Sequence, residues 1–599
     1  MVALTSTPVR PAVEAAEPPV RRRRTRPFRP VDAVIMLGYG LAAFLLYRPL
    51  WLNLDSGYLR FSGQDQNLWE WFYAVTAHNV LNFENLLFTT LQNHPDGVNL
   101  SANTAMYGLA LPLTPVTILF GPTATFTLVL TGGLAGTASA WYWVLSRHLV
   151  DSRVGAAVGA AFCGFAPPMI SHANAHPNWV ALFVMPFIVL WLLKIVRGAP
   201  PVSSGIVLGL LVTWQVFIGK EPLLVMATTM VVFALVYALM APGHTLAVAP
   251  RLGAGLGVGA AVSLVIVAVP LWWQFFGPQS YSALEHGLRG NDAAAFTAFA
   301  SDSLAGGEYS GAGLAMNRTE ENAFFGWPLV LVVLGITVAL WRVLAARAVA
   351  VTMLAMAWIS MGAIVIVDGE GTSIPGPWML LFDRPLFESV LETRFSLGCV
   401  PLIGILLAMA TERVLRLRVR SDQRRAAAVV WCGVLATALL PIVPTELHVT
   451  ERKAAPAFFT EGDWRVYVRD GSVVPVPPPD VADAEALHWQ METGMGFPLV
   501  EGYFVGPNEE GDGMYGAPRR RTSLILEYVA MRGETYEVTA YDRVIARSDL
   551  RYWEADVVVL PLDAPYRHEL QATVTDLLED PGHPVKDVWV WDVHALLTR

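Results

Sequence analysis

Long apolar segments alternate with short polar ones over most of residues 30–446. A helix that crosses a bilayer needs about 17–25 mostly apolar residues. We predict a membrane-spanning helix in each of about eleven segments of this kind: 33–52, 124–146, 153–170, 179–196, 203–219, 222–241, 252–275, 323–341, 348–367, 395–411 and 426–446. One further apolar run, 104–121, is short, contains Pro112 and Pro115, and ends in Gly121-Pro122.

The charges between these segments indicate how the run 104–121 is placed. If it does not cross the membrane, the basic loops fall on the side of the N-terminus and the acidic loops on the opposite side, as the positive-inside rule requires. The basic loops are those with Arg147 and Arg153, Lys194 and Arg197, Arg251, Arg342 and Arg347, and Arg413 to Arg425. We therefore predict a cytoplasmic N-terminus, about eleven spans and a re-entrant or interfacial segment at 104–121.

Two segments near the N-terminus are not predicted to span. Residues 1–32 are rich in proline, alanine and arginine, and we expect a disordered cytoplasmic tail whose basic run 21–26 fixes the orientation. Residues 67–82 have a helical pattern but are too polar to cross, and their aromatic side chains suit the headgroup zone of a membrane. Packing of this helix on neighbouring helices is the alternative.

After the last predicted span the sequence becomes charged and mixed. Residues 447–599 are predicted to form an extracytoplasmic α/β domain, which leaves 33–446 as a transmembrane domain with a first outer loop at 53–123. Within the C-terminal part we predict strands, one helix and a stiff proline-rich loop. The strands are at 464–468, 535–541, 555–562 and 588–593, the helix at 566–580 and the loop at 471–480.

Composition agrees with a polytopic α-helical membrane protein. Of the 599 residues, 54% are hydrophobic and 15% are charged, whereas soluble domains carry about 25% charged residues. The three cysteines, Cys163, Cys399 and Cys432, lie in apolar segments and are interpreted as packing residues. The sequence has no Walker motif and no G-x-G-x-x-G fingerprint. No nucleic-acid partner is expected, since arginines beside a first span are ordinary orientation signals.

Ionisable and polar residues gather at helix ends on the predicted outer side. Such groups are costly near a membrane and are therefore candidates for function. Each also has a structural alternative, such as helix capping, a local ion pair, a turn or contact with lipid headgroups. The candidates are Asp55, Asp65, His94, Asp96, His172, His176, Lys220, Glu221 and Arg394. His172 and His176 share one face if their stretch is helical.

The layout resembles the GT-C superfamily of integral membrane glycosyltransferases. The shared pattern is a first span, a long outer loop with an early acid, juxtamembrane helices, many further spans and often an outer C-terminal domain. The most specific match is GQDQNLWEWF at 63–72. Many members carry two adjacent acids here, whereas Asp65 stands between Gln64 and Gln66. The size and C-terminal domain also resemble actinobacterial cell-envelope arabinofuranosyl- and mannosyltransferases.

The resemblance implies transfer of a sugar from a polyprenyl-phosphate donor to a hydroxyl of a glycan or lipid-linked acceptor, outside the membrane and with inversion. The acceptor hydroxyl needs a general base, for which we expect Asp65, with Asp55 as the alternative. The leaving lipid phosphate needs fixed positive charge. Arg394 suits this need because a guanidinium can hold two phosphate oxygens. Further phosphate contacts are expected from Lys220, His172 and His176.

Substrate contacts are also expected from His94, Asp96, Glu221 and Trp69. No organic cofactor is implied, and a divalent cation (Mg, Mn or Ca), if used, is expected on the oxygens of Asp65, Asp96 and Glu221. A metal on the histidine pair is the alternative. We expect the prenyl tail in a groove between 67–82 and 104–121, in contact with membrane lipids. The loop 491–507 is expected either to bind the acceptor or to be a plain structural loop.

Other function classes stay open. A polysaccharide polymerase or ligase would use the same lipid-phosphate chemistry. A transporter or lipid flippase would place its charged groups near mid-bilayer and often shows internal repeats, whereas the acids here lie outside the predicted spans and no repeat is visible. A non-catalytic scaffold would not need polar residues at the helix mouths.

Overall fold

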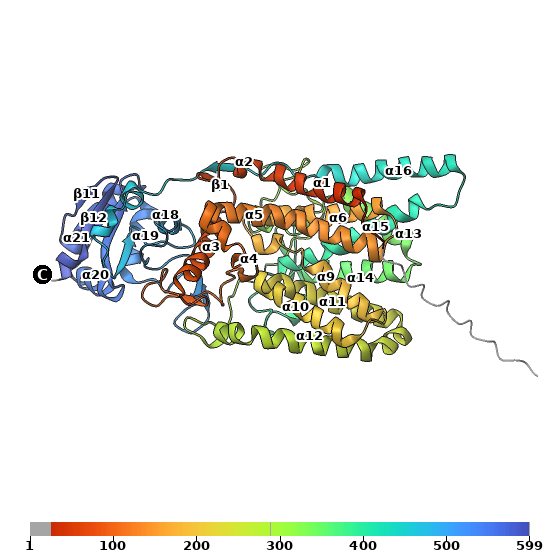
Figure 1. Ribbon diagram of the computed structural model, residues 1–599. Helices are drawn as coiled ribbons and strands as arrows, with labels where there is room; N and C mark the ends of the chain where they lie inside the picture. The colour runs from red at the N-terminus through yellow and green to blue at the C-terminus, as the bar shows by residue number, and fades with distance from the viewer. Residues whose placement is uncertain (1–25, 288, 598–599) are drawn as a thin grey trace, which may run out of the picture.

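The beginning of the N-terminal helix and the C-terminal region lie at opposite ends of a bundle of helices in the computed structural model, which describes residues 26–287 and 289–597 (Figure 1). Most of the predicted tail, residues 1–25, lies outside the described residues. Arg26 is described, and its guanidinium lies 4.0 Å from the carboxylate of Asp151. The described part of the chain thus begins at one end of the bundle, and its mixed α/β region lies at the other end.

Within the described residues, seven helical segments are long and apolar enough to cross a membrane, and four shorter apolar helices accompany them. The helices of the bundle are α1 (Pro30–Leu46), α5 (Thr114–Val144), α6 (Arg153–Phe165), α9 (Met185–Val196), α10 (Pro201–Ile218), α11 (Lys220–Met240), α12 (Pro242–Phe276), α13 (Trp327–Leu340), α14 (Leu344–Ile359), α15 (Cys399–Leu415) and α16 (Ser421–Leu439). Each predicted span overlaps one of them, so the chain is a polytopic helical membrane protein. The number of helices that cross stays a prediction.

Shorter elements join these helices. They are α2 (Arg48–Trp51), β1 (Gly57–Leu59), α3 (Asp65–Asn82), β2 (Phe88–Thr89), β3 (Val98–Asn99), α4 (Tyr107–Ala110), α7 (Pro167–His172), α8 (Pro177–Val180), β4 (Ile364–Val367) and β5 (Glu370–Pro375). β4 and β5 form a hairpin. The predicted span 348–367 is therefore too long, because its last residues belong to this hairpin.

The run 104–121 is divided from the helix that follows it. It contains the single turn α4 and, from Thr114, a short helical piece that reaches Gly121. Gly121 has φ 84° and ψ 165°, which is not helical, so the backbone breaks there and α5 consists of two helices. Thr117 Oγ1 lies 2.9 Å from Thr125 Oγ1, which one continuous helix would not allow, since eight residues advance about 12 Å. The predicted division between 104–121 and 124–146 is therefore confirmed, and the re-entrant or interfacial placement of 104–121 stays a prediction.

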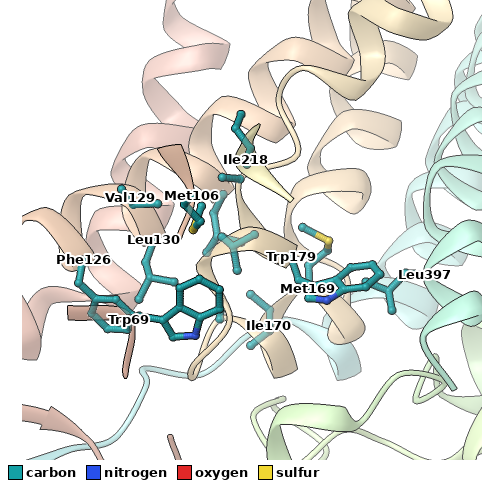
Figure 2. Close-up of a cluster of buried hydrophobic side chains, with 14 of the residues drawn as sticks. Trp69, Met106, Phe126, Val129, Leu130, Met169, Ile170, Trp179, Ile218 and Leu397 are labelled. Atoms are coloured by element: carbon teal, nitrogen blue, oxygen red, sulfur yellow. The ribbon is translucent and has the colours of Figure 1, made fainter. Parts of the chain in front are cut away.

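The helix α3 is buried in protein rather than spread on a membrane surface. Trp71, Phe72 and Tyr73 are each at most 2% exposed, and α3 contacts α4, α5 and a helix of the C-terminal region. Trp69 packs in the same core, near Phe126 and Leu130 (Figure 2). The surface placement was wrong, since rings that suit a headgroup zone also suit a protein interior.

The C-terminal region is built on a four-stranded sheet in the order β11-β12-β10-β7, with β10 antiparallel to β12 and parallel to β7. Its elements are β6 (Val449–Glu451), α17 (Ala457–Thr460), β7 (Ser472–Pro475), α18 (Glu485–Glu492), β8 (Val505–Pro507), β9 (Gly513–Tyr515), α19 (Arg521–Arg532), α20 (Ala540–Tyr552), β10 (Ala555–Pro561), α21 (Arg567–Leu578), β11 (His583–Val585), β12 (Val588–Asp592) and α22 (Val593–Leu597). The last two predicted strands and the helix between them are confirmed.

Three other predictions for this region are wrong. Residues 464–466 belong to the short 3₁₀ helix Asp463–Val466, and 535–541 lead into α20. The segment 471–480 contains strand β7, because Val473 and Val474 are almost fully buried. Pro475 is tolerated because β7 is an edge strand of the sheet, where a missing N–H is least costly.

Candidate functional site

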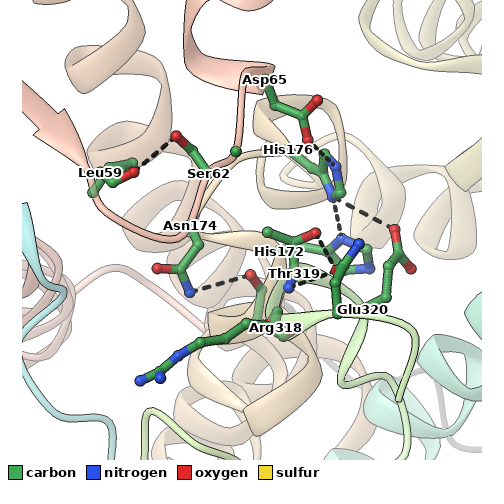
Figure 3. A network of polar contacts seen from close by, with 12 residues as sticks. Leu59, Ser62, Asp65, His172, Asn174, His176, Arg318, Thr319 and Glu320 are labelled. Carbon is green, nitrogen blue, oxygen red and sulfur yellow. Dashed lines mark hydrogen bonds and ion pairs between the residues drawn. The ribbon is translucent and has the colours of Figure 1, made fainter. Parts of the chain in front are cut away.

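The candidate site begins at Asp65, the first residue of α3, at the bundle end that meets the C-terminal region (Figures 1 and 3). One carboxylate oxygen lies 3.1 Å from Nε2 of His176. The other accepts a hydrogen bond from the hydroxyl of Tyr503, which belongs to the C-terminal region. The Asp65 side chain is 20% exposed, so it stays reachable while two neighbours fix its orientation.

The two histidines come together through a pair of short helices rather than one continuous helix. α7 ends at His172, and His176 precedes Pro177, whose ring disfavours helical backbone in the preceding residue. The rings nevertheless face each other, with 2.8 Å between the two Nδ1 atoms (Figure 3). His172 also stacks on Trp179 at a centroid distance of 5.3 Å.

A buried ion cluster lies next to the histidines. Arg394 donates hydrogen bonds to Glu320 through Nε and Nη2 and to Glu221 through Nη1, the last at 2.5 Å. Glu320 also lies 3.8 Å from Nδ1 of His176 and accepts a 2.7 Å hydrogen bond from Asn322. Two acids, Glu221 and Glu320, thus share a single arginine, and Asp65 is connected to them through His176.

A polar scaffold holds the histidine loop against the segment that carries Glu320. The hydroxyl of Ser171 donates to the carbonyl of Arg318 and accepts from the backbone N–H of Glu321. Asp302 accepts hydrogen bonds from both Asn174 and Arg318. Both segments are therefore fixed at several points, so the ring nitrogens and the Glu320 carboxylate keep a defined geometry.

Burial and neighbouring charge set the protonation states of the site. Burial alone would raise the pKa of Glu320, but the Arg394 guanidinium outweighs it and holds that pKa well below its usual range. Burial holds the pKa of His172 well below its usual value, so the ring is neutral near pH 7. Burial and the nearby Asp65 raise the pKa of Tyr503 well above its usual value, so its hydroxyl keeps the proton that it donates.

These residues fit a divalent cation. Ligand atoms of His172, His176 and Glu320 all lie within 4.8 Å of one another. Nε2 of His172 is buried and has no hydrogen-bond partner among the described residues. Two imidazoles and one carboxylate suit Zn²⁺ or another transition metal better than Mg²⁺ or Ca²⁺, which take oxygen ligands. The predicted oxygen set of Asp65, Asp96 and Glu221 is not the group that the fold assembles.

The structure brings together five of the predicted residues and leaves the others elsewhere. Asp65, His172, His176, Glu221 and Arg394 meet in one cluster. The other predicted residues lie outside this cluster. Asp55 lies exposed in a turn before β1, His94 pairs with Glu554, Asp96 accepts from Tyr552, Trp69 is in the core, and Lys220 bonds Ser101 and Gln274.

Two residues of the cluster were not singled out from the sequence. Glu320 lies in the loop between α12 and α13, where the pair Glu320-Glu321 directly precedes an apolar span. Two adjacent acids directly before a predicted span are the feature of the sequence that could have identified Glu320 as a candidate. Tyr503 lies within the loop 491–507, for which acceptor binding was predicted, but nothing local in the sequence connects it to Asp65.

No protein-family model and no curated protein matches the chain. Among solved structures it is similar to the oligosaccharyltransferase AglB from Archaeoglobus fulgidus in complex with an inhibitory peptide and a dolichol-phosphate, at 11% identity and a TM-score of 0.47, over 92% of this chain and 71% of that one. It is also similar to a mutant arabinofuranosyltransferase AftD from Mycobacteria, at 12% identity and a TM-score of 0.49, over 94% of this chain and 42% of that one. Both neighbours belong to the GT-C superfamily. At such low identities and TM-scores neither likeness supports an inference about the function of this chain.

Proposed function

We propose that this chain is a membrane glycosyltransferase that moves a sugar from a polyprenyl-phosphate donor to a hydroxyl of a glycan or lipid-linked acceptor, on the extracytoplasmic side. The observation that supports the proposal is the setting of Asp65, held by His176 and Tyr503 at the edge of a cluster of acids, imidazoles and one guanidinium. Sugar transfer from a phosphate needs a base for the acceptor and stabilisation of charge on the leaving group. The cluster offers groups for both.

In the proposed step the acceptor hydroxyl loses its proton to Asp65 while its oxygen forms a bond to the anomeric carbon. The bond between that carbon and the donor phosphate oxygen breaks, and its electron pair leaves with the phosphate. Attack from the face opposite to the leaving group inverts the configuration. Asp55 is the alternative base, but its exposed position in a turn gives it no comparable setting.

Arg394 is the proposed partner of the donor phosphate. A guanidinium has five N–H bonds, and the contacts to Glu221 and Glu320 use those of Nε, one on Nη1 and one on Nη2. The remaining N–H bonds on Nη1 and Nη2 can donate to phosphate oxygens without breaking the ion pairs. Glu221 and Glu320 then hold the guanidinium in place.

The group His172, His176 and Glu320 is the proposed cation site. A bound cation would supply positive charge to a developing phosphate leaving group. Asp65 lies against Nε2 of His176, which leaves Nδ1 of that ring directed at His172 and Glu320. In this arrangement Asp65 also fixes the tautomer of a ligand, as carboxylates behind metal-binding histidines do.

The test compares purified wild type with Asp65→Asn in nanodiscs, using a series of polyprenyl-phosphate sugars and short glycan acceptors. We expect Asp65→Asn to lower the transfer rate by about 10²–10⁴-fold, since a positioned base contributes that much. Asp55→Asn is the matched control and should stay within about twofold of wild type. Absence of product with every donor, or equal rates for wild type and Asp65→Asn, would show the proposal to be wrong.

A further inference from the structure

The helix α19 of the C-terminal region has apolar side chains on two faces. One face packs into the core through Ile525 and Val529, which are both buried. Leu524, Tyr528 and Met531 recur at spacings of four and three, so they share a second face of the helix. Their side chains are between 44% and 75% exposed. A helix that is apolar on both faces is ordinarily covered on both, and here the second face is uncovered.

The neighbouring helix α20 extends this exposed face. α19 and α20 pack against each other, and Tyr541 and Val544 of α20 are 62% and 63% exposed. Arg521 joins the two helices, because its guanidinium lies 5.4 Å from the Tyr541 ring and it precedes Tyr528 by seven positions on the same face of α19. We define the α19–α20 face as the exposed side chains of Leu524, Tyr528, Met531, Tyr541 and Val544.

Membrane lipid does not account for the α19–α20 face. Exposed apolar residues on the long helices of the bundle suit a bilayer, but α19 and α20 lie beyond the end of that bundle (Figure 1). A contiguous apolar patch on a domain outside the bilayer marks a contact surface. Tyrosine, methionine and arginine are enriched in protein interfaces, whereas a small-molecule site needs several precisely placed polar groups. We therefore expect a protein to cover this face.

Charged residues of both signs lie at one edge of the α19–α20 face. Arg532 ends α19, and Glu534 and Glu537 follow in the segment that leads to α20. This segment lies beside the face, because the Tyr536 ring is 6.1 Å from the Tyr528 ring. All three charged side chains are exposed, and none forms an ion pair within residues 26–287 and 289–597. An edge with an unpaired cation next to unpaired acids is complementary to a copy of itself.

We infer that two copies of this chain associate through their α19–α20 faces, related by a two-fold axis. In such an interface Arg532 of one copy can pair with the partner's Glu534 or the partner's Glu537, and the reverse pairs form at the same time. A membrane protein has one orientation in its bilayer, so the faces of two copies lie at the same height above the membrane and can meet. The inference does not depend on the proposed sugar transfer.

The test measures the oligomeric state of the full-length protein. Mass photometry over a concentration series in detergent gives the dissociation constant of the dimer, and single-molecule photobleaching in liposomes gives the state in a membrane. We expect wild type to dimerise. Tyr528→Asp puts a charge in the middle of the α19–α20 face, and we expect it to raise the dissociation constant at least about tenfold.

Val466→Asp is the matched control for this variant. Val466 is an exposed apolar residue of the same C-terminal region, 76% exposed, but it lies on the short 3₁₀ helix Asp463–Val466 outside the α19–α20 face. It should dimerise as wild type does. Thermal unfolding of both aspartate variants in detergent verifies that each one is folded.

A charge exchange tests the two-fold pairing and does not depend on the folding of Tyr528→Asp. Arg532→Glu in one protein, and Glu534→Arg with Glu537→Arg in another, should each weaken self-association about tenfold, because like charges then meet across the axis. A mixture of the two proteins should dimerise as wild type does, since opposite charges face each other again. Different affinity tags on the two proteins report the mixed dimer by co-purification.

A wild type that is monomeric in both detergent and liposomes would overturn the inference, even if its α19–α20 face binds a glycan. A dimer that Tyr528→Asp leaves intact would do the same, because the contact would then lie elsewhere. A charge-exchanged mixture that stays monomeric would overturn the two-fold arrangement. Protein that dimerises through this face but transfers no sugar would retain this inference and refute the proposed glycosyltransferase.

Discussion

The two ends of the helix bundle each bury charged side chains, but in opposite proportions. At the end near the N-terminus one carboxylate, Asp32, is fully buried and contacts two arginines, Arg153 at 2.7 Å and Arg147 at 3.3 Å. It also accepts from the hydroxyl of Tyr142 and the backbone N–H of Arg29. At the other end two carboxylates, Glu221 and Glu320, share Arg394, and a third, Asp65, lies against His176.

The different ratio of carboxylates to arginines distinguishes a cluster that holds helices together from a cluster that can bind a ligand. Asp32, on α1, has both oxygens paired by groups from α5, α6 and the segment that joins those two helices. In the other cluster Nε2 of His172, Oε1 of Glu221 and Oδ1 of Asn322 are buried without hydrogen-bond partners among the described residues. Buried polar atoms are rarely left unpaired, so an excess of acid with unused atoms indicates a site.

The largest effect is expected from Asp32→Asn. The change leaves Arg147 and Arg153 without their counter-charge in a buried setting, and breaking such a pair costs about 3–5 kcal/mol. We expect a marked loss of thermal stability in detergent, measured by fluorescence-detected unfolding. Asp422→Asn is the control, because its pair with Arg420 is exposed and exposed pairs contribute about 0–1 kcal/mol. Equal stability of Asp32→Asn and wild type would contradict a structural role for this cluster.

The second effect concerns the cation that the unbalanced cluster is proposed to hold. Added Zn²⁺ or Mn²⁺ should stabilise chelator-treated wild type, by about 2.7 kcal/mol at a concentration one hundred times the Kd. His172→Gln should abolish this gain, whereas His94→Gln, which changes a histidine paired with Glu554, should keep it. A thermal shift of the same size in all three proteins would place the cation elsewhere.

The third prediction tests the boundary between the bundle and the C-terminal region, where His488 packs beside Arg452. Burial, assisted by the Arg452 charge, lowers the pKa of His488 to about 3. The folded state therefore favours the neutral ring, and stability is lost as pH falls from the unfolded pKa near 6.5 toward 3. Between pH 7 and pH 5 this contributes a loss of about 2 kcal/mol. His488→Gln should reduce the difference in melting temperature between these two pH values, and an unchanged difference would show that His488 is not responsible.

The smallest effect is expected from Tyr503→Phe. The change removes the hydrogen bond to Asp65 and keeps the buried ring, and a hydrogen bond to a charged group contributes about 1.5–3 kcal/mol. We expect transfer to slow about tenfold, and stability to fall by no more than this contribution. Tyr515→Phe is a matched control, because its ring lies 6.4 Å from Tyr503 and no hydrogen bond joins its hydroxyl to Asp65. If both variants behave alike, Tyr503 has no special role.

The membrane helices could be predicted from the sequence because a bilayer imposes one requirement over many consecutive residues. The hydrophobic pattern of the sequence was less informative for segments that are surrounded by other parts of the protein. The aromatic pattern of α3 fits a membrane surface and a protein core equally well, and only tertiary packing on α5 and α18 decides between them. Likewise the valines of β7 form a strand through pairing with β10, far along the chain, in spite of neighbouring prolines.

The site was predictable in part for a similar reason. Alternation of spans placed Asp65, His172, Glu221 and Arg394 on one side, which is a necessary condition for the contacts that the structure has. It could not distinguish them from His94 and Asp96 on the same side, since both of these turn toward the C-terminal region. Residues brought in by tertiary contact, such as Tyr503, leave no local pattern to find.

The contact between Asp65 and Tyr503 joins residues 438 positions apart. During synthesis the ribosome therefore finishes every helix of the bundle before the residue that completes the setting of Asp65 exists. A nascent or truncated chain that ends before β7 has Asp65, both histidines and Arg394 but lacks the Tyr503 hydroxyl. The hydrogen bond that fixes Asp65 can therefore form only after the whole bundle and part of the C-terminal region have been synthesised. A partial chain in the membrane lacks this bond.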